Sequence, residues 1–110
     1  MRRGEVRWVD FGSPDKRRPA VILTRSSAIG YLGSVTVAPI TTTIRETPSH
    51  VRLGQEDGLQ TACAVNLHNL QTVTKTNVDS LITVLSESKM VAIEAALLFA
   101  LGMDRRLRLG

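Results

Sequence analysis

Residues 16–24 read Lys16-Arg17-Arg18-Pro19-Ala20-Val21-Ile22-Leu23-Thr24, and this stretch decides the fold because three consecutive cations lead directly into a short apolar run. A run of this length with β-branched residues predicts a buried β-strand. Pro19 fixes φ where the strand begins and removes one backbone donor. Arg18 is therefore expected at the mouth of a buried element, anchored in the fold yet open to solvent.

A second stretch, 35–43, repeats this design with hydroxyl groups. It begins as a β-branched run and ends in the polar residues Thr41, Thr42 and Thr43. If the two strands pair, the Arg18 guanidinium and these hydroxyls line one shallow site. The guanidinium suits phosphate because its fork of donors matches phosphate oxygens two at a time. The sequence therefore predicts a phosphate site.

The remainder of the chain indicates further short strands and one long helix. Alternating residues predict strands over 4–11 and 50–53, and a last strand is predicted over 81–85. Residues 62–74 are predicted as one long strand with a bend or bulge at Asn66. A single helical turn is expected within 26–34, and a capped turn over 76–79.

The C-terminal helix begins at a Ser86 cap and ends at Gly102. Its predicted core stripe is Met90, Ile93, Leu97 and Leu101. Because Glu94 is the only charge from Met90 to Leu101, either the sheet alone or the sheet and a second subunit cover this helix. We predict a mainly β (α+β) fold, a small antiparallel barrel or curled sheet closed by this helix, as one domain over 1–104 with a basic tail over 105–110.

Composition bounds the function. The 110 residues support one compact domain, and no apolar run reaches the ~18 residues of a membrane span. The first residues lack the apolar stretch of a signal peptide, so a cytoplasmic protein without membrane contact is expected. The single cysteine, Cys63, is predicted to be a core residue. The net charge of +4 favours a polyanionic partner.

The residue types exclude several chemistries. The chain has no Gly-rich phosphate loop, no HExxH and no paired cysteines, and His50 and His68 are not at metal-ligand spacing, so neither a metal nor a cofactor is expected. RNA cleavage needs the least apparatus, because the substrate's 2′-hydroxyl is the nucleophile. Arginine is a poor general base, so the acid or base partner is open among these residues: Glu5, Asp10, Asp15 and His50.

Plainer interpretations stand beside this one. An arginine at a strand edge is more often a surface charge than a catalyst, and a threonine run is usually only a strand end. A histidine in the position of His50 is more often a hydrogen-bonded sheet residue than a functional one. Trp8 and Phe11 are expected in the core, since four aromatic residues are too few for a stacking platform. Composition alone indicates only a small basic β-domain.

Five segments in register change that balance. They are Gly4-Glu5-Val6-Arg7-Trp8-Val9-Asp10, Arg17-Arg18-Pro19-Ala20-Val21-Ile22-Leu23, Val37-Ala38-Pro39-Ile40-Thr41, Pro48-Ser49-His50-Val51 and Leu67-His68-Asn69-Leu70-Gln71-Thr72-Val73. In this order and spacing the chain resembles the MazF/PemK toxin family, from Gly4 to about Met103. The resemblance implies an SH3-like barrel of the CcdB/MazF/PemK type and a homodimer. It also implies a toxin endoribonuclease, or mRNA interferase, with a cognate antitoxin whose acidic tail covers the RNA groove.

The same resemblance implies metal-independent, sequence-specific cleavage of single-stranded RNA to 2′,3′-cyclic phosphate and 5′-hydroxyl ends. Carried over by position, the family's catalytic residues fall on Arg18 and Thr41. The RNA-binding residues expected beside them are Lys16, Arg17, Thr42, His50, Asn69 and Gln71.

Two departures from the family pattern bear on the site. The first loop is short, and Asp15 is the nearest match to an acidic residue that some members place before the arginine. Several members carry Glu-Gln-Ile-Arg where this chain has residues 68–71, so its cleavage preference should differ. Two other functions remain: a CcdB-like gyrase poison on the same fold, and a non-catalytic RNA-binding SH3-like module.

Overall fold

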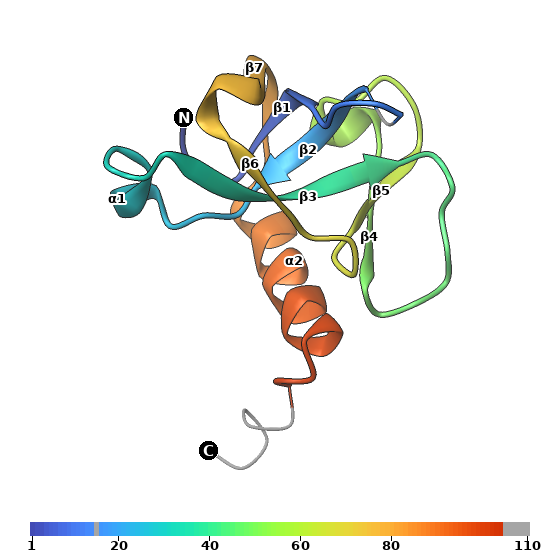
Figure 1. Ribbon diagram of the computed structural model, residues 1–110. Helices are drawn as coiled ribbons and strands as arrows, with labels where there is room; N and C mark the ends of the chain where they lie inside the picture. Colours follow the sequence, from blue (N-terminus) through green and yellow to red (C-terminus); the bar gives the residue numbers. More distant parts are fainter. Residues whose placement is uncertain (15, 105–110) are drawn as a thin grey trace.

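The computed structural model describes residues 1–14 and 16–104, which form a curled antiparallel sheet with one long helix standing on it (Figure 1). Within these residues the elements follow in the order β1 (Glu5–Asp10), β2 (Arg17–Ile22), α1 (Ser26–Ile29), β3 (Ser34–Thr41), β4 (His50–Leu53), η1 (Gln55–Asp57), β5 (Cys63–Asn66), β6 (Gln71–Thr74), η2 (Lys75–Asn77), β7 (Val78–Val84) and α2 (Glu87–Ala100). The predicted tail, 105–110, lies outside the described residues.

Strand β3 is the centre of the sheet. The strand order is β4-β5-β3-β2-β1-β7, and β6 also pairs with β3. Val37 lies opposite Gln71 of β6, whereas Thr41 lies opposite Ala64 of β5. The prediction of one bulged strand over 62–74 is therefore wrong: a turn divides it, in which the Asn69 backbone N–H donates to the Asn66 carbonyl at 3.3 Å.

The sheet is curled but not closed by strand pairing, since β4 and β7 are its two outer strands. The turn after η1 lies against β7, where Thr83 Oγ1 donates to the Asp57 carbonyl at 3.0 Å. Gly58 has φ +95°, and a Cβ there would lie 2.4 Å from Thr83 Oγ1, so only glycine fits. The predicted fold class, mainly β with a C-terminal helix, is confirmed.

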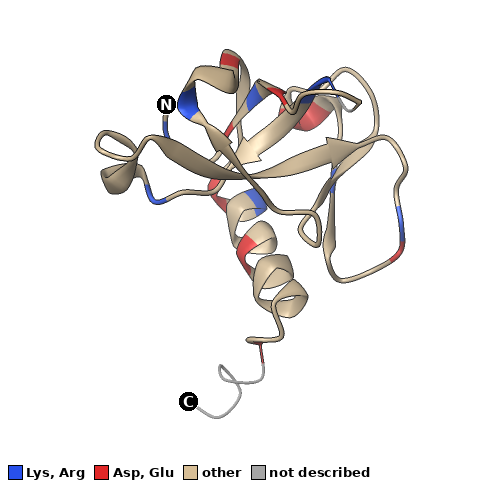
Figure 2. Cartoon of the chain, in the orientation of Figure 1, with Lys and Arg blue, Asp and Glu red and all other residues tan. Residues whose placement is uncertain are grey.

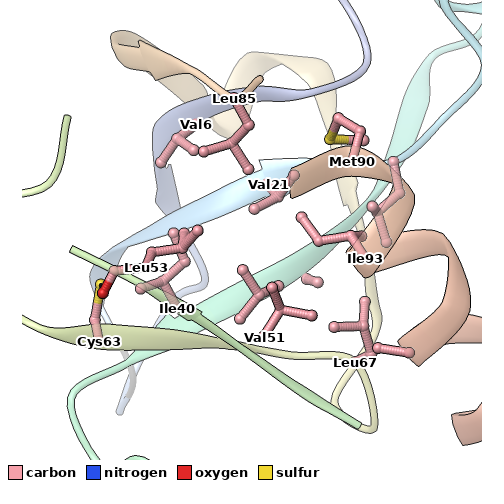
Figure 3. Close-up of a cluster of buried hydrophobic side chains, with 14 of the residues drawn as sticks. Val6, Val21, Ile40, Val51, Leu53, Cys63, Leu67, Leu85, Met90 and Ile93 are labelled. Atoms are coloured by element: carbon pink, nitrogen blue, oxygen red, sulfur yellow. Dashed lines mark hydrogen bonds between the residues drawn. The ribbon is translucent and has the colours of Figure 1, made fainter. Parts of the chain in front are cut away.

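Two apolar clusters cover the two faces of the sheet. The larger lies between the sheet and α2 and includes Val21, Val51, Met90 and Ile93 (Figure 3). The smaller is formed by β1, β2, β3 and β6 around Ile29 of α1. Cys63 is 4% exposed, as predicted for a core residue. Burial raises the pKa of its thiol, and Asp57 raises this pKa further.

The cap of α2 is confirmed, because Ser86 Oγ accepts a hydrogen bond from the Lys89 backbone N–H at 3.3 Å. Met90 and Ile93 are buried as predicted, but Leu101 is 54% exposed, so that part of the predicted stripe is wrong. The reason is that α2 ends at Ala100: Leu97 and Ala100 in its last turn still pack against the larger cluster, but Leu101 follows them at the far end of the helix (Figure 1). No helix among the described residues is long and apolar enough to cross a membrane.

Two smaller expectations also fail. The predicted capped turn over 76–79 is instead the 3-10 turn η2, which starts one residue earlier and has no side-chain cap at Thr74. Trp8 is 36% exposed although the core was predicted for it, because its side chain lies at the rim of the sheet beside Arg17. Phe11 packs, partly buried, against the smaller cluster.

Candidate functional site

The pairing register of β1, β2 and β3 defines the position of Arg18 in the sheet. Its Cα partner is Val9 on β1, and Ala20 is the partner of Pro39 on β3. When that β2–β3 register is continued by two residues, Arg18 comes opposite Thr41. Side chains directly opposite in antiparallel strands have Cβ atoms about 4.5–5.5 Å apart. Arg18 is half-buried and, among the described residues, has no carboxylate partner within ion-pair distance.

The Thr41 hydroxyl is already oriented by its own backbone. Its Oγ1 accepts a hydrogen bond from the Thr43 backbone N–H at 3.0 Å. An occupied acceptor leaves the hydroxyl proton as a donor toward a phosphate oxygen. Thr41 and the exposed Thr42 also border a hollow of about 270 Å³, whose apolar walls include Trp8, Leu59 and Ile82.

The row that begins with Arg18 continues across the sheet. Thr41 pairs with Ala64, and Ala64 pairs with Arg52 on β4. Side chains two residues apart on a strand share a face, so His50 and Arg52 point to the same side. Arg52 is ion-paired with Glu46. Sequence reasoning did not single out Arg52, although the alternation over 50–53 carried the signal.

The neutral ring of His50 is held in one tautomer. Its Nδ1 accepts a hydrogen bond from the Arg45 backbone N–H at 3.3 Å, which leaves the proton of the neutral ring on Nε2. Burial lowers the pKa of His50, and the charges of Arg45 and His68 lower this pKa further. At neutral pH the ring is therefore an uncharged donor through Nε2 rather than a base.

His50 has a polar neighbour that sequence reasoning also missed. Its Cα partner across the β4–β5 pair is Asn66. The Asn66 side-chain oxygen accepts from the His68 backbone N–H at 3.0 Å. The sequence marked Asn66 only as a bend, because its place beside His50 depends on the pairing of β4 with β5.

Lys16 and Arg17 lie on the loop side of the site, and Arg17 does not share its face. The Arg17 guanidinium forms an ion pair with Asp79 at 3.1 Å and lies 5.2 Å from the centre of the Trp8 ring. By alternation it points to the face opposite Arg18. Lys16 is exposed at φ +58°, and its backbone N–H donates to the Gly12 carbonyl at 2.6 Å.

Asn69 and Gln71 lie along the other half of β3. Asn69 is exposed in the β5–β6 turn, and Gln71 is half-buried opposite Val37. From Val37 to Thr41 is about 13 Å along the strand at the usual rise per residue. Five of the predicted site residues, Arg18, Thr41, His50, Asn69 and Gln71, thus border β3 and its neighbours, whereas Arg17 is directed away.

The candidate acidic residues differ in their distance from Arg18. Glu5 is four residues from Val9 along β1, about 13 Å from the row of Arg18. Its side chain is ion-paired with Arg7 at 2.7 Å. Burial raises the pKa of Glu5, but hydrogen bonds from the Arg7 side chain and the Arg2 backbone outweigh it, so this pKa lies below its ordinary value.

Asp10 is nearer to the site than Glu5, since its Cα partner is Arg17, next to Arg18. Its Oδ1 accepts from the Gly12 backbone N–H at 2.8 Å. Asp15 lies outside the described residues. Within the described part of the chain, no group of three or more His, Cys, Asp or Glu residues could hold a metal ion.

Comparison with known proteins identifies the family of the chain. Residues 2–101 match the family described as PemK-like, MazF-like toxin of type II toxin-antitoxin system. The chain is 34% identical over 99 residues to the endoribonuclease MazF3 of Mycobacterium tuberculosis, covering 90% of this chain and 96% of that protein. It is 32% identical to the endoribonuclease MazF of Staphylococcus epidermidis, covering 94% of this chain and 93% of that protein.

Two solved structures have the same fold. The Mycobacterium tuberculosis toxin MazF-mt6 superposes with a TM-score of 0.84 at 33% identity, covering 91% of this chain and 98% of that one. A mycobacterial endoribonuclease in complex with its cognate antitoxin also gives a TM-score of 0.84, at 28% identity, covering 94% of this chain and 96% of that one.

Proposed function

The chain belongs to the PemK/MazF family of toxins of type II toxin-antitoxin systems and is an endoribonuclease, and on this premise we propose that it cleaves single-stranded RNA at a phosphate held between Arg18 and Thr41. The observation that carries this proposal is the β2–β3 register, whose last pair is Ala20 with Pro39 and which, continued by two residues, brings Arg18 opposite Thr41. An arginine without an ion-pair partner among the described residues, beside a hydroxyl whose proton is free to donate, forms a pair of phosphate donors.

The proposed reaction is a transesterification that needs no metal. The 2′-hydroxyl oxygen attacks the neighbouring phosphorus, the P–O2′ bond forms and the P–O5′ bond breaks. The proton lost by the 2′-hydroxyl is balanced by the proton gained by O5′. The products are a 2′,3′-cyclic phosphate and a 5′-hydroxyl. Arg18 stabilises the extra negative charge on the phosphorane, and Thr41 donates to one of its oxygens.

The positions of the side chains reduce the set of candidates for the groups that transfer the two protons. Asp10 lies beside the Arg18 end of the row, and His50 offers a neutral Nε2–H on its far side. Glu5 is set aside by its distance along β1 and by its ion pair with Arg7. The RNA-binding residues proposed around the phosphate are Lys16, Arg17, Thr42, His50, Asn69 and Gln71.

The direct test is cleavage of a mixed RNA pool by the purified protein in the presence of a chelator, with the new 5′ ends mapped. We expect 5′-hydroxyl ends at one short sequence, and no cut where the scissile nucleotide is 2′-deoxy. Uncut RNA would favour a gyrase poison or a non-catalytic binding module. Cleavage of the 2′-deoxy substrate, or activity lost with the chelator, would contradict the mechanism.

The proposed partners are a cognate antitoxin and a second copy of the chain, acting in the cytoplasm where the RNA substrate is found. A net charge of +4 suits the acidic tail of an antitoxin. Exposed apolar residues on α2 and directly after it support a homodimer, because Val91, Phe99, Leu101 and Met103 are 40–55% exposed. Light scattering should give the mass of a dimer for the wild type, and of a monomer for Val91→Glu.

A further inference from the structure

A second group of cations lies around α1, away from Arg18 and Thr41. They are Arg2, Arg3, Arg25 and Lys75. Among the described residues, none of the four has a carboxylate within ion-pair distance, in contrast to Arg7, Arg17, Arg52 and Lys89. Like charges that gather without counter-charges raise the potential of a surface and favour an anionic ligand.

Three separated parts of the chain bring these cations together. Arg2 and Lys75 line one hollow with Ser26, Ser27 and Gly30, and none of the acidic residues that the structure describes lines it. The Arg3 backbone N–H donates to Ser26 Oγ at 2.9 Å. Figure 2 shows the corresponding blue segments at the N-terminus, ahead of α1 and at η2, on one side of the molecule.

Lys75 joins two of the segments that carry these cations. Its Nζ donates to the Ile29 carbonyl at 2.8 Å, although the two residues are far apart in sequence. The Lys75 backbone N–H also donates to the Gly33 carbonyl, at 3.0 Å. The end of α1 and η2 are therefore held against each other, so the cations around them keep a defined spacing.

An exposed aromatic residue follows the hollow directly in the chain. Tyr31, directly after Gly30 of the hollow, is 79% exposed, and Leu32 is 39% exposed. A tyrosine so exposed contributes little to the core. Exposed aromatic rings next to cations are typical of surfaces that bind single-stranded nucleic acid, where bases stack on the rings and cations follow the phosphates.

These cations lie where an RNA strand bound at Arg18 can reach them. The chain runs from Arg18 along β2 to Arg25, seven residues and roughly 20 Å at the rise of a strand. Ile29 of α1 packs in the smaller cluster with Ala20 and Ile22, which by alternation share the face of Arg18. Nucleotides flanking the scissile phosphate can therefore follow β2 to α1.

We propose that Arg2, Arg3, Arg25, Lys75 and Tyr31, the α1 cluster, bind nucleotides flanking the cleavage site in single-stranded RNA. The cations contact phosphates and the Tyr31 ring stacks on a base. This inference rests on the proposed function, because it takes RNA as the substrate. The α1 cluster then raises the affinity for longer RNA and takes no part in cleavage of the scissile bond.

The test measures binding of mixed-sequence 2′-O-methyl RNA, which cannot be cleaved, at about 8 and about 24 nucleotides. The variants are R2Q/R3Q/R25Q and Tyr31→Ala, with R2K/R3K/R25K and Tyr31→Phe as controls that keep the charge or the ring. These side chains are exposed and make no side-chain hydrogen bonds among the described residues, and equal melting temperatures should confirm intact folding.

The wild type should bind the longer RNA more tightly than the shorter. Both test variants should lose about fivefold or more of that affinity, and neither control should lose it. Binding of the short 2′-O-methyl RNA should not change in any variant, and neither should cleavage of an unmodified RNA of the same length. Unchanged affinity of both test variants for the long RNA would overturn the α1 proposal and leave the cleavage mechanism intact.

Two further outcomes would also overturn the proposal, for different reasons. If the wild type binds neither RNA and cleaves none, the proposed function itself fails. If R2Q/R3Q/R25Q loses affinity for polyglutamate while its affinity for RNA is unchanged, the α1 cluster is a contact for an acidic protein instead.

Discussion

The two faces of β2 at its N-terminal end differ although Arg17 and Arg18 are neighbours in sequence. Arg17 is held by Asp79 and lies over the Trp8 ring. Arg18 points to the other face, without an ion-pair partner among the described residues, in the row of Thr41. Strand alternation therefore separates a cation that holds the sheet together from one that is available to a ligand.

The largest expected effect compares the two arginines in catalysis. Arg18→Ala should lower kcat/KM for RNA cleavage by about 100- to 1000-fold, because one preorganised donor to the transition state is lost. Arg17→Ala should lower it by less than about tenfold. Single-turnover cleavage of one mapped substrate measures both. Equal losses in the two variants would remove the distinction between the faces.

A second difference should appear in the salt dependence of binding. Each phosphate contact contributes about −0.7 to the slope of log affinity against log salt for a single strand. Arg18→Ala should make the slope shallower by about this amount, and Arg17→Ala by less, since Arg17 is already neutralised by Asp79. Titration of uncleavable RNA at several salt concentrations gives the slopes. A larger change of the slope in Arg17→Ala than in Arg18→Ala would contradict the comparison.

Stability should show the opposite order. Arg17→Ala removes an exposed ion pair and a cation–π contact, together worth about 1 kcal/mol or less. Arg18→Ala removes neither and should leave the melting temperature nearly unchanged. Thermal unfolding of the two variants and of Asp79→Asn measures this, with Asp79→Asn expected to lose less stability than Arg17→Ala because it keeps the cation–π contact. A larger loss in Arg18→Ala would mean that Arg18 also holds the sheet.

The smallest effect belongs to His50, on the face of Arg18. Burial lowers its pKa in the folded protein, so the unfolded chain takes up the proton first as the pH falls. The stabilisation is fully present above the ordinary value of about 6.5 and declines as the pH drops from there through the folded-state pKa. The melting temperature of the wild type should fall more than that of His50→Gln between neutral pH and pH 5. Parallel curves would contradict the assignment.

Local patterns predicted much of this molecule. Alternation located β1 and β4, the Ser86 cap located the start of α2, and the apolar run after Arg18 located β2. The β5–β6 turn was missed because its residues, 67–70, include neither glycine nor proline, and both strands pair with β3 in different registers.

What escaped prediction depends on tertiary contacts. The exposure of Leu101 follows from the end of α2 at Ala100, the last helical residue that still packs against the larger cluster. The pairing of Arg17 with Asp79 joins residues far apart in the chain. The candidate pair, Arg18 and Thr41, could be proposed from the sequence because both end β-branched runs, but its register needed the pairing of β2 with β3.

A double-mutant cycle with Arg18→Lys and Thr41→Val tests most directly whether the two side chains act on one phosphoryl group. The readout is kcat/KM for a single mapped RNA substrate, and residues that act as a unit give strongly non-additive losses. The account predicts that the double variant cleaves only slightly more slowly than the slower single variant. Losses that multiply, as for independent sites, would contradict it.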